Sequence, residues 1–207
     1  MANIRVKICG LTSVDDAVMA CHAGADAIGL VFYPPSTRHV DIATAKAIVT
    51  MLPPFVQSVA LFVNPQRQFV EQVLQQVAID LLQFHGDEGE QFCASFSRPY
   101  IKAFAMRDDI QLEQNMKLYA SAKGFLLDAW HPRKPGGTGE RFDWQRFPQH
   151  ADKPLILAGG LTVDNVQQGI TQCQPYAVDV SGGVEQSPGK KSAEKVQLFI
   201  QQAKSLL

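Results

Sequence analysis

The sequence has little that would suit a nucleic acid or a membrane surface. Lysine plus arginine total 19 and aspartate plus glutamate total 20, which leaves a formal net charge of −1 at pH 7. This balance, without a basic or acidic run, gives no electrostatic attraction for either partner. No apolar run is long enough to cross a bilayer, and the first residues, M-A-N-I-R-V-K, are typical of a strand rather than of a signal peptide. We therefore expect neither a nucleic-acid nor a membrane partner.

Cysteine is also scarce, and its spacing excludes further classes. The cysteines form no C-x-x-C pair, and the five histidines show no metal-ligand spacing. We therefore expect neither a metal site nor a disulfide scaffold, and free thiols indicate a reducing compartment, the cytoplasm. No G-x-G-x-x-G follows the first apolar run, which weakens a dinucleotide-binding interpretation. The four cysteines are Cys9, Cys21, Cys93 and Cys173.

What the chain does have is a regular alternation of apolar runs and helix-like stretches. Its 207 residues, 46% of them hydrophobic, suit one domain over residues 1–207. Strands are predicted at residues 4–9, 27–32, 55–62, 81–84, 100–104, 124–127, 154–158 and 177–180. Helices are predicted at residues 13–23, 42–51, 66–77, 88–96, 111–120, 143–147, 162–172 and 192–207.

This alternation predicts the fold class. Strands that alternate with helices pair in parallel and are joined by right-handed crossovers. Eight such repeats indicate an α/β protein with a single (β/α)8 TIM barrel, and a doubly wound open sheet is the alternative. Thr12, with Asp15 three residues later, predicts the N-terminal cap of the first helix. In a barrel, the residues that end the strands line the mouth and carry the chemistry.

Paired glycines follow the last two predicted strands. The run P-L-I-L-A-G-G-L covers residues 154–161, and A-V-D-V-S-G-G-V covers residues 177–184. Glycine lets backbone N–H groups approach an anion closely, and a helix that starts nearby adds a partial positive charge. Tight turns that only connect strand to helix are the alternative. We expect a phosphate site formed by Gly159, Gly160, Ser181, Gly182 and Gly183.

Two predicted mouth residues have acid–base chemistry. Cys9 ends the first strand just before a helix, whose N-terminus can lower the pKa of a thiol and make it a base or nucleophile. Asp128 directly follows an apolar strand, where a carboxyl group needs partners or water, and it is a candidate general acid. The structural alternatives are a small buried hydrophobe for Cys9 and a loop cap for Asp128.

Three further residues suit a substrate. The fork of Arg38 matches a carboxylate or a phosphate, unless it is a plain surface arginine. His85 either positions a substrate or is satisfied by neighbouring backbone. Asp179 either accepts hydrogen bonds from ligand hydroxyls or pairs with Lys7 inside the barrel. The glycine-rich loop at residues 135–139 is long enough to fold over a site. An acid and a base at one mouth indicate proton transfer in an isomerase.

Seven short motifs occur in one order along the chain. They are K-I-C-G at residues 7–10, L-Q-F-H-G at 82–86, L-L-D-A at 126–129, G-G-T-G at 136–139, F-D-W at 142–144, L-A-G-G-L at 157–161 and G-V-E at 183–185. Together they resemble the phosphoribosylanthranilate isomerase family of tryptophan biosynthesis over nearly the whole chain. The resemblance implies a one-domain (β/α)8 barrel that uses no cofactor, monomeric and sometimes dimeric, acting on a phosphosugar.

The resemblance also implies roles for individual residues. The reaction is the Amadori rearrangement of N-(5-phosphoribosyl)anthranilate to 1-(2-carboxyphenylamino)-1-deoxyribulose 5-phosphate. By resemblance, Cys9 is the general base, Asp128 is the general acid and Arg38 faces the anthranilate carboxylate, while the paired glycines form the phosphate cradle. The chain departs from the family pattern at Thr37, where proline is usual, and at Gly182, where serine is usual.

Three other functions remain open from the sequence. Another phosphate-binding barrel enzyme, such as indole-glycerol-phosphate synthase, would carry lysines and glutamates where this chain has Cys9 and Asp128. A non-catalytic sensor of sugar phosphates would need neither a base nor an acid. A dehydrogenase is the weakest alternative, because the dinucleotide motif is missing.

Overall fold

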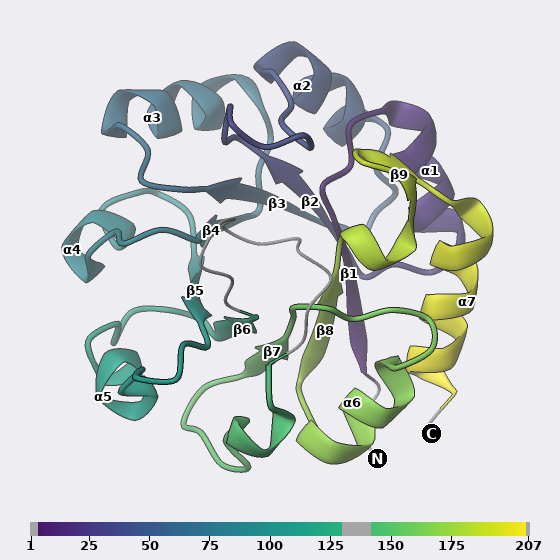
Figure 1. Ribbon diagram of the computed structural model, residues 1–207. Coiled ribbons are helices and arrows are strands. Elements are labelled where there is room, and N and C mark those ends of the chain that lie inside the picture. The colour runs from purple at the N-terminus through teal and green to yellow at the C-terminus, as the bar shows by residue number, and fades with distance from the viewer. Residues whose placement is uncertain (1–3, 130–141, 206–207) are drawn as a thin grey trace.

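The strands of the chain close into a barrel. In a computed structural model, which describes residues 4–129 and 142–205, β1 to β8 are hydrogen-bonded in sequence order and β8 pairs with β1. All eight ladders are parallel, as strands joined by crossover helices require (Figure 1). The predicted (β/α)8 fold class is confirmed, and the doubly wound open sheet is wrong.

The strands and helices lie close to their predicted positions. The barrel strands are β1 (Arg5–Cys9), β2 (Ala27–Val31), β3 (Gln57–Phe62), β4 (Leu81–Phe84), β5 (Tyr100–Ala105), β6 (Phe125–Asp128), β7 (Leu155–Leu157) and β8 (Ala177–Val180). The α-helices are α1 (Val14–His22), α2 (Ile42–Thr50), α3 (Arg67–Gln76), α4 (Glu90–Cys93), α5 (Leu112–Lys117), α6 (Val166–Cys173) and α7 (Ala193–Lys204).

Several details differ from the sequence prediction, and α4 covers only Glu90–Cys93 of the predicted residues 88–96. The sixth helix is only a 3₁₀ turn, η1 (Trp144–Arg146). The cap of α1 is Ser13, whose Oγ accepts from the amide of Asp16, while Thr12 Oγ1 donates to the carbonyl of Gly189. After β8 the chain adds a 3₁₀ turn, η2 (Gly182–Val184), and a small hairpin of β9 (Glu185–Ser187) and β10 (Lys190–Lys191).

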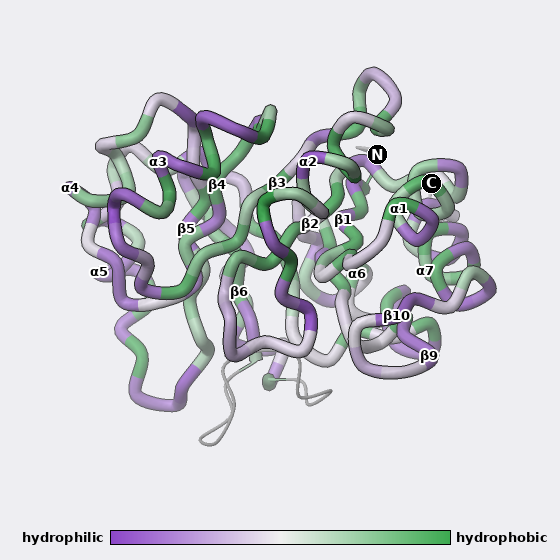
Figure 2. The backbone as a smooth tube through the Cα atoms, turned by 90° about the horizontal axis from the view of Figure 1, so that it is seen from above, coloured by the Kyte–Doolittle hydropathy of each residue, from purple (hydrophilic) through white to green (hydrophobic). Residues whose placement is uncertain are grey.

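Successive side chains along each strand point alternately toward the helices and into the barrel. In β1, Val6 and Ile8 are fully buried in the main hydrophobic core, which lies between strands and helices, whereas Cys9 belongs to a separate small cluster with Val31 and Leu61. Figure 2 shows apolar residues concentrated along the strands, with the β9–β10 hairpin at the opposite end of the molecule from the start of β1. Because successive side chains point to opposite faces, Lys7 and Cys9 point into the barrel.

No helix among the described residues is long and apolar enough to cross a membrane.

Candidate active site

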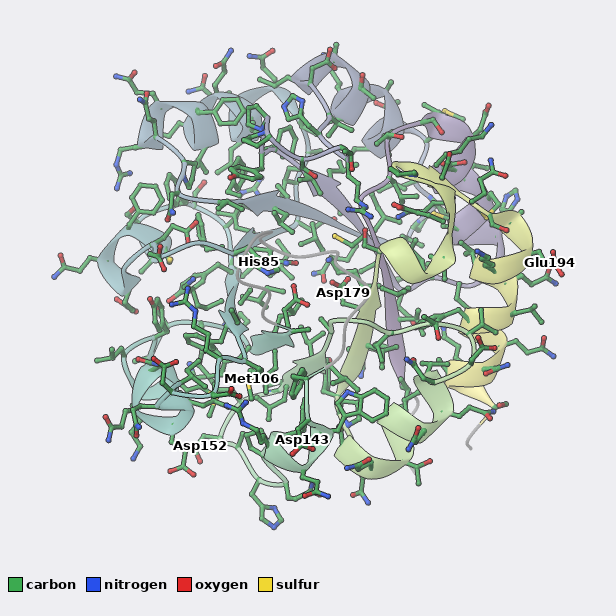
Figure 3. All side chains as sticks on the ribbon, in the orientation of Figure 1. His85, Met106, Asp143, Asp152, Asp179 and Glu194 are labelled. Carbon is green, nitrogen blue, oxygen red and sulfur yellow. The ribbon has the colours of Figure 1, made fainter. Side chains whose placement is uncertain are left out.

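The candidate site lies where the barrel strands end. Cys9 is the last residue of β1, Asp128 is the last of β6, His85 follows β4, and Asp179 lies one residue before the end of β8. Strands in one parallel barrel all end at the same mouth, so these side chains converge. Figure 3 shows His85 and Asp179 within the ring of strands, whereas Asp152 and Glu194 lie at the periphery.

Cys9 occupies a niche that depends on a glycine in the next strand. The residue is 5% exposed and packs with Val31 and Leu61. Its partner in the ladder is Gly29, where a Cβ atom would lie 2.7 Å from Cys9 Sγ and 3.1 Å from Lys7 Cε. A contact of 2.7 Å is too short for these atoms, so a larger residue at position 29 would displace the thiol.

Burial dominates the ionisation of Cys9. It raises the pKa of the thiol, and the positive charges of Lys7 and Lys191 oppose this effect while the carboxylate of Asp179 adds to it. A helix N-terminus can lower the pKa of a thiol, but the net direction for Cys9 is upward. The physical reason is burial inside the barrel, which disfavours an anion more than the nearby cations favour it.

Asp128 is held by a chain of polar contacts from β4. The carboxyl group is buried, and its Oδ2 lies 3.1 Å from His85 Nε2. Nδ1 of His85 lies 3.1 Å from Nε2, the side-chain amide nitrogen of the fully buried Gln83. Through these two contacts His85 bridges Gln83 and Asp128. Sequence reasoning missed Gln83, although a polar residue inside L-L-Q-F was the signal.

Arg38 is not a plain surface arginine. Its Nε and Nη2 donate to both carboxylate oxygens of Glu185, at 2.7 Å and 2.8 Å. Lys191 Nζ donates to the same carboxylate at 2.9 Å and to the carbonyl of Ser181 at 3.2 Å. Burial alone would raise the pKa of Glu185, but hydrogen bonds from Arg38 and the charge of Lys191 hold it below its usual value. Sequence reasoning assigned no role to Glu185 or Lys191.

The loop that carries Arg38 is closed by its own hydrogen bonds. Ser36 Oγ accepts from the amide of Arg38, and the carbonyl of Ser36 accepts from the amide of His39. Thr37, in the position where the family usually has proline, lies within this turn. Proline would fix φ at position 37, and in this chain local hydrogen bonds hold the turn instead.

Asp179 pairs with Lys7, as one of its two predicted alternatives states. Lys7 Nζ donates to Oδ1 of Asp179 at 2.8 Å, and both side chains are buried. Oδ2 accepts no hydrogen bond from the described residues. That oxygen remains available for a ligand hydroxyl, so binding by Asp179 stays a prediction alongside the observed ion pair.

A cavity at the mouth joins Asp128 and Asp179 to the glycine turns. Ser181 Oγ, next to this cavity, is buried and has no hydrogen-bond partner among the described residues. The backbone amides of Gly160 and Gly182 likewise donate to no backbone carbonyl among the described residues. Such free donors suit an anion. The lining consists of Asp128, Ala158, Gly159, Gly160, Leu161, Asp179, Val180, Ser181, Gly182 and Gly183.

Two of the glycines are also required by packing. Gly159 has φ +79°, and a Cβ there would lie 2.2 Å from the amide nitrogen of Ala129. A Cβ at Gly183 would lie 1.8 Å from the carbonyl oxygen of Leu161. The loops after β7 and β8 therefore contact each other through bare backbone. The two readings of the paired glycines, tight turns or anion cradle, are compatible in this geometry.

This close packing gives a stability prediction. We expect Gly183→Ala to lower the free energy of unfolding by about 1–3 kcal/mol or more, because the new methyl group must push two backbone segments apart. Gly89→Ala is the control, since a Cβ there meets nothing within 4 Å. Urea unfolding followed by circular dichroism measures both. Equal unfolding midpoints for the two variants would contradict the packing argument.

A larger cavity, of about 750 Å³, opens at the opposite, N-terminal end of the barrel. Its lining includes Arg5, Ala27, Gln57 and the fully exposed Phe55. Size alone would favour it as the site, but Asp128, Asp179 and the glycine turns line the cavity at the mouth and not this one. In barrels of this type the N-terminal face serves stability, so we assign the site to the mouth.

The remaining sequence predictions concern the glycine-rich loop, the absence of a metal site and the other three cysteines. The glycine-rich loop at residues 135–139 lies outside the described residues. Within residues 4–129 and 142–205, no group of three or more histidine, cysteine, aspartate or glutamate side chains is placed to hold a metal ion. Cys21, Cys93 and Cys173 lie on α1, α4 and α6, and burial raises the pKa of all three thiols.

Comparison with known proteins gives one consistent result. A family model described as N-(5'phosphoribosyl)anthranilate (PRA) isomerase matches residues 6–202. The N-(5'-phosphoribosyl)anthranilate isomerase of Pseudomonas putida KT2440 is 54% identical over 204 residues, which cover 99% of each chain.

Solved structures agree with the sequence relatives. Phosphoribosyl anthranilate isomerase from Thermotoga maritima matches with a TM-score of 0.90 and 38% identity, covering 98% of this chain and 100% of that one. A phosphoribosyl anthranilate isomerase in complex with reduced 1-(o-carboxyphenylamino)-1-deoxyribulose 5-phosphate matches with a TM-score of 0.84 and 36% identity, with the same coverage.

Proposed function

This chain belongs to the N-(5'-phosphoribosyl)anthranilate isomerase family, and from that premise we propose how its barrel mouth performs the reaction. It is an enzyme of tryptophan biosynthesis that isomerises N-(5'-phosphoribosyl)anthranilate to 1-(2-carboxyphenylamino)-1-deoxyribulose 5-phosphate. We assign the chemistry to one catalytic domain over residues 1–207. The observation that carries the assignment is the shared cavity of Asp128 and the two glycine turns.

The general acid acts first. Asp128 donates a proton to the ring oxygen of the furanose, the bond between that oxygen and C1′ breaks, and the amine lone pair forms a protonated Schiff base. His85 Nε2, 3.1 Å from Oδ2, supports this role because it fixes the orientation of the carboxyl group. The second oxygen of Asp128 lies close to Gly159, near the turn that we assign to the phosphate.

The general base completes the rearrangement. The Schiff-base cation makes the hydrogen on C2′ acidic, and the Cys9 thiolate removes it to give an enolamine. The enolamine then tautomerises to the ketone, and the proton on Cys9 and the proton lost by Asp128 are exchanged with solvent. The cation serves as its own electron sink, so we propose that no cofactor takes part.

The remaining residues bind the substrate in this proposal. Arg38 faces the anthranilate carboxylate with the guanidinium edge that Glu185 leaves open. Oδ2 of Asp179 accepts a hydrogen bond from a ribose hydroxyl, and His85 orients the substrate together with Asp128. The phosphate binds the amides and the hydroxyl of the two turns, which are contributed by Gly159, Gly160, Ser181, Gly182 and Gly183.

Loss of anthranilate fluorescence tests the function. The substrate is fluorescent and the rearrangement abolishes that signal, so purified protein should cause a decay that scales with enzyme concentration. A sugar-phosphate sensor would bind the substrate without decay. A decay that persists unchanged when Cys9 and Asp128 are both replaced would remove them from the mechanism.

Gly182 gives a prediction about affinity. The family pattern leads us to expect a serine hydroxyl here, and this chain has only the backbone amide. We expect Gly182→Ser to lower KM about fivefold, which corresponds to about 1 kcal/mol for one added hydrogen bond, while kcat stays within twofold. Steady-state fluorescence assays measure both constants. An unchanged KM would show that the phosphate does not need a hydroxyl at this position.

We propose that the protein acts in the cytoplasm. All four cysteines are unpaired, which supports a reducing compartment.

We propose that the protein acts as a monomer, with a homodimer as the alternative. Sedimentation velocity at micromolar concentration distinguishes the two assemblies.

A further inference from the structure

The role of general base that we assign to Cys9 requires its thiolate, and burial disfavours that anion. The inference that follows rests on the proposed function. We propose that Lys7, anchored by Asp179, is the positioning residue that supplies the counter-charge for the Cys9 thiolate. Lys7 acts through the thiol and does not itself transfer a proton to or from the substrate.

The strand geometry places the two side chains together. Lys7 and Cys9 are two residues apart in β1, so they point into the barrel on the same side. A Cβ at Gly29 would lie within 3.1 Å of both Cys9 Sγ and Lys7 Cε, so the thiol and the lysine stem share the space that this glycine leaves. Any larger side chain at position 29 would separate them.

Asp179 fixes the ammonium in that space. The Lys7 Nζ–Asp179 Oδ1 distance is 2.8 Å, and the two residues are 5% and 8% exposed. An ammonium has three N–H donors: Lys7 donates one to Asp179, and its other side-chain hydrogen-bonding interaction is with Cys9. Burial would lower the pKa of Lys7, but Asp179 and Cys9 outweigh that effect and hold it above its usual value. The lysine therefore stays charged throughout the working pH range.

The charges around Cys9 support the same conclusion. Lys7, Asp179, Lys191 and Arg38 interact electrostatically with the Cys9 thiol. Glu185 is the carboxylate that pairs with Arg38 and Lys191. Three of these residues are cations and two are carboxylates, so within this group one positive charge has no carboxylate to balance it. A Cys9 thiolate would balance it. Lys7 has the largest opposing effect on the raised pKa of Cys9, ahead of Lys191.

The test measures ionisation of Cys9 directly. The ultraviolet absorbance of the thiolate is followed against pH in each variant, and the same titration in a matched Cys9→Ser background is subtracted. We expect Lys7→Met to move the midpoint to higher pH, and Asp179→Asn to move it to lower pH because Asp179 raises the pKa of Cys9. Lys46→Met, which changes an exposed lysine on α2, should leave the midpoint unchanged.

Opposite displacements separate an electrostatic role from a structural one. Loss of packing would disturb both variants in the same direction. Lys7→Met leaves Asp179 buried without its partner and can fail to fold, so the double variant Lys7→Met/Asp179→Asn, which buries no charge at the pair, is titrated too. Its midpoint should also be higher, because the effect of Lys7 exceeds that of Asp179. An unchanged midpoint in a folded Lys7 variant, or a rise in Asp179→Asn, overturns the inference.

Turnover gives an independent readout. Below the midpoint, kcat/KM of Lys7→Met should fall about tenfold for each pH unit by which the midpoint rises. Full turnover in Cys9→Ser would refute the proposed base while leaving the titration of Lys7 variants meaningful. Inactive Cys9→Ser together with an unmoved midpoint in Lys7→Met would refute only the role of Lys7.

Discussion

Cys9→Ser should lower kcat by ~10²–10⁴-fold, the usual contribution of a general base, with KM changed by no more than about threefold. A serine hydroxyl is slightly smaller than the thiol, so it fits the niche opposite Gly29 without displacing neighbours. It is, however, far harder to deprotonate at neutral pH. Removal of a proton from C2′ then has no base, while the groups that bind phosphate and carboxylate are intact.

The measurement is the fluorescence decay under single-turnover and steady-state conditions. Cys21→Ser is the matched control, because Cys21 lies on α1 outside the mouth and is only half-buried. It should retain full activity. Turnover within twofold of the parent protein in Cys9→Ser would remove the thiol from the mechanism.

The direction in which kcat/KM of this reaction changes with pH follows from the role of Cys9. A general base works only when deprotonated, so kcat/KM should rise with pH as the Cys9 thiol ionises. Burial raises the pKa of Cys9, so this rise should occur at higher pH than for an exposed thiol. The residual activity of Cys9→Ser should lack it.

The sequence was informative about the fold because the barrel repeats one local rule. Each apolar run of β-branched and aliphatic residues forms a strand, and the intervening amphipathic stretches form helices on the outside (Figure 1). The rule failed at η1, where three residues form a 3₁₀ turn in place of the helix predicted at residues 143–147. The β9–β10 hairpin was also missed, although Pro188 and Gly189 are turn residues that signal it.

The candidate site was predictable in its residue types but not in its pairings. Position at a strand end was enough to select Cys9 and Asp128. The partner of Arg38, however, is Glu185, which lies 147 residues away, and the partner of Lys7 is 172 residues away. Such pairs depend on how β8 closes onto β1 and on the loop that follows β8, which local patterns do not encode. The direction of the Cys9 pKa depends on burial in the closed barrel for the same reason.

Replacement of the general acid should have an effect comparable to loss of the base. We expect Asp128→Asn to lower kcat by ~10²–10⁴-fold, because an amide has nearly the same shape as the carboxyl group but cannot give up a proton to the ring oxygen. Without that proton the furanose stays closed and the Schiff-base cation does not form. The amide keeps an oxygen that can face His85 Nε2, as Oδ2 of Asp128 does at 3.1 Å, so the orientation of the side chain should be kept.

Binding and folding measurements separate chemistry from structure in this variant. Titration calorimetry with reduced 1-(o-carboxyphenylamino)-1-deoxyribulose 5-phosphate, the ligand of a solved relative, should give a Kd within about fivefold of the parent protein. Asp152→Asn changes an exposed aspartate at the periphery of the barrel and should leave both turnover and binding unaltered (Figure 3). Full turnover in Asp128→Asn would refute the assigned acid. A parallel loss of binding and thermal stability would instead show that Asp128 maintains the mouth, since a group needed only to deliver a proton leaves the ground-state complex unchanged.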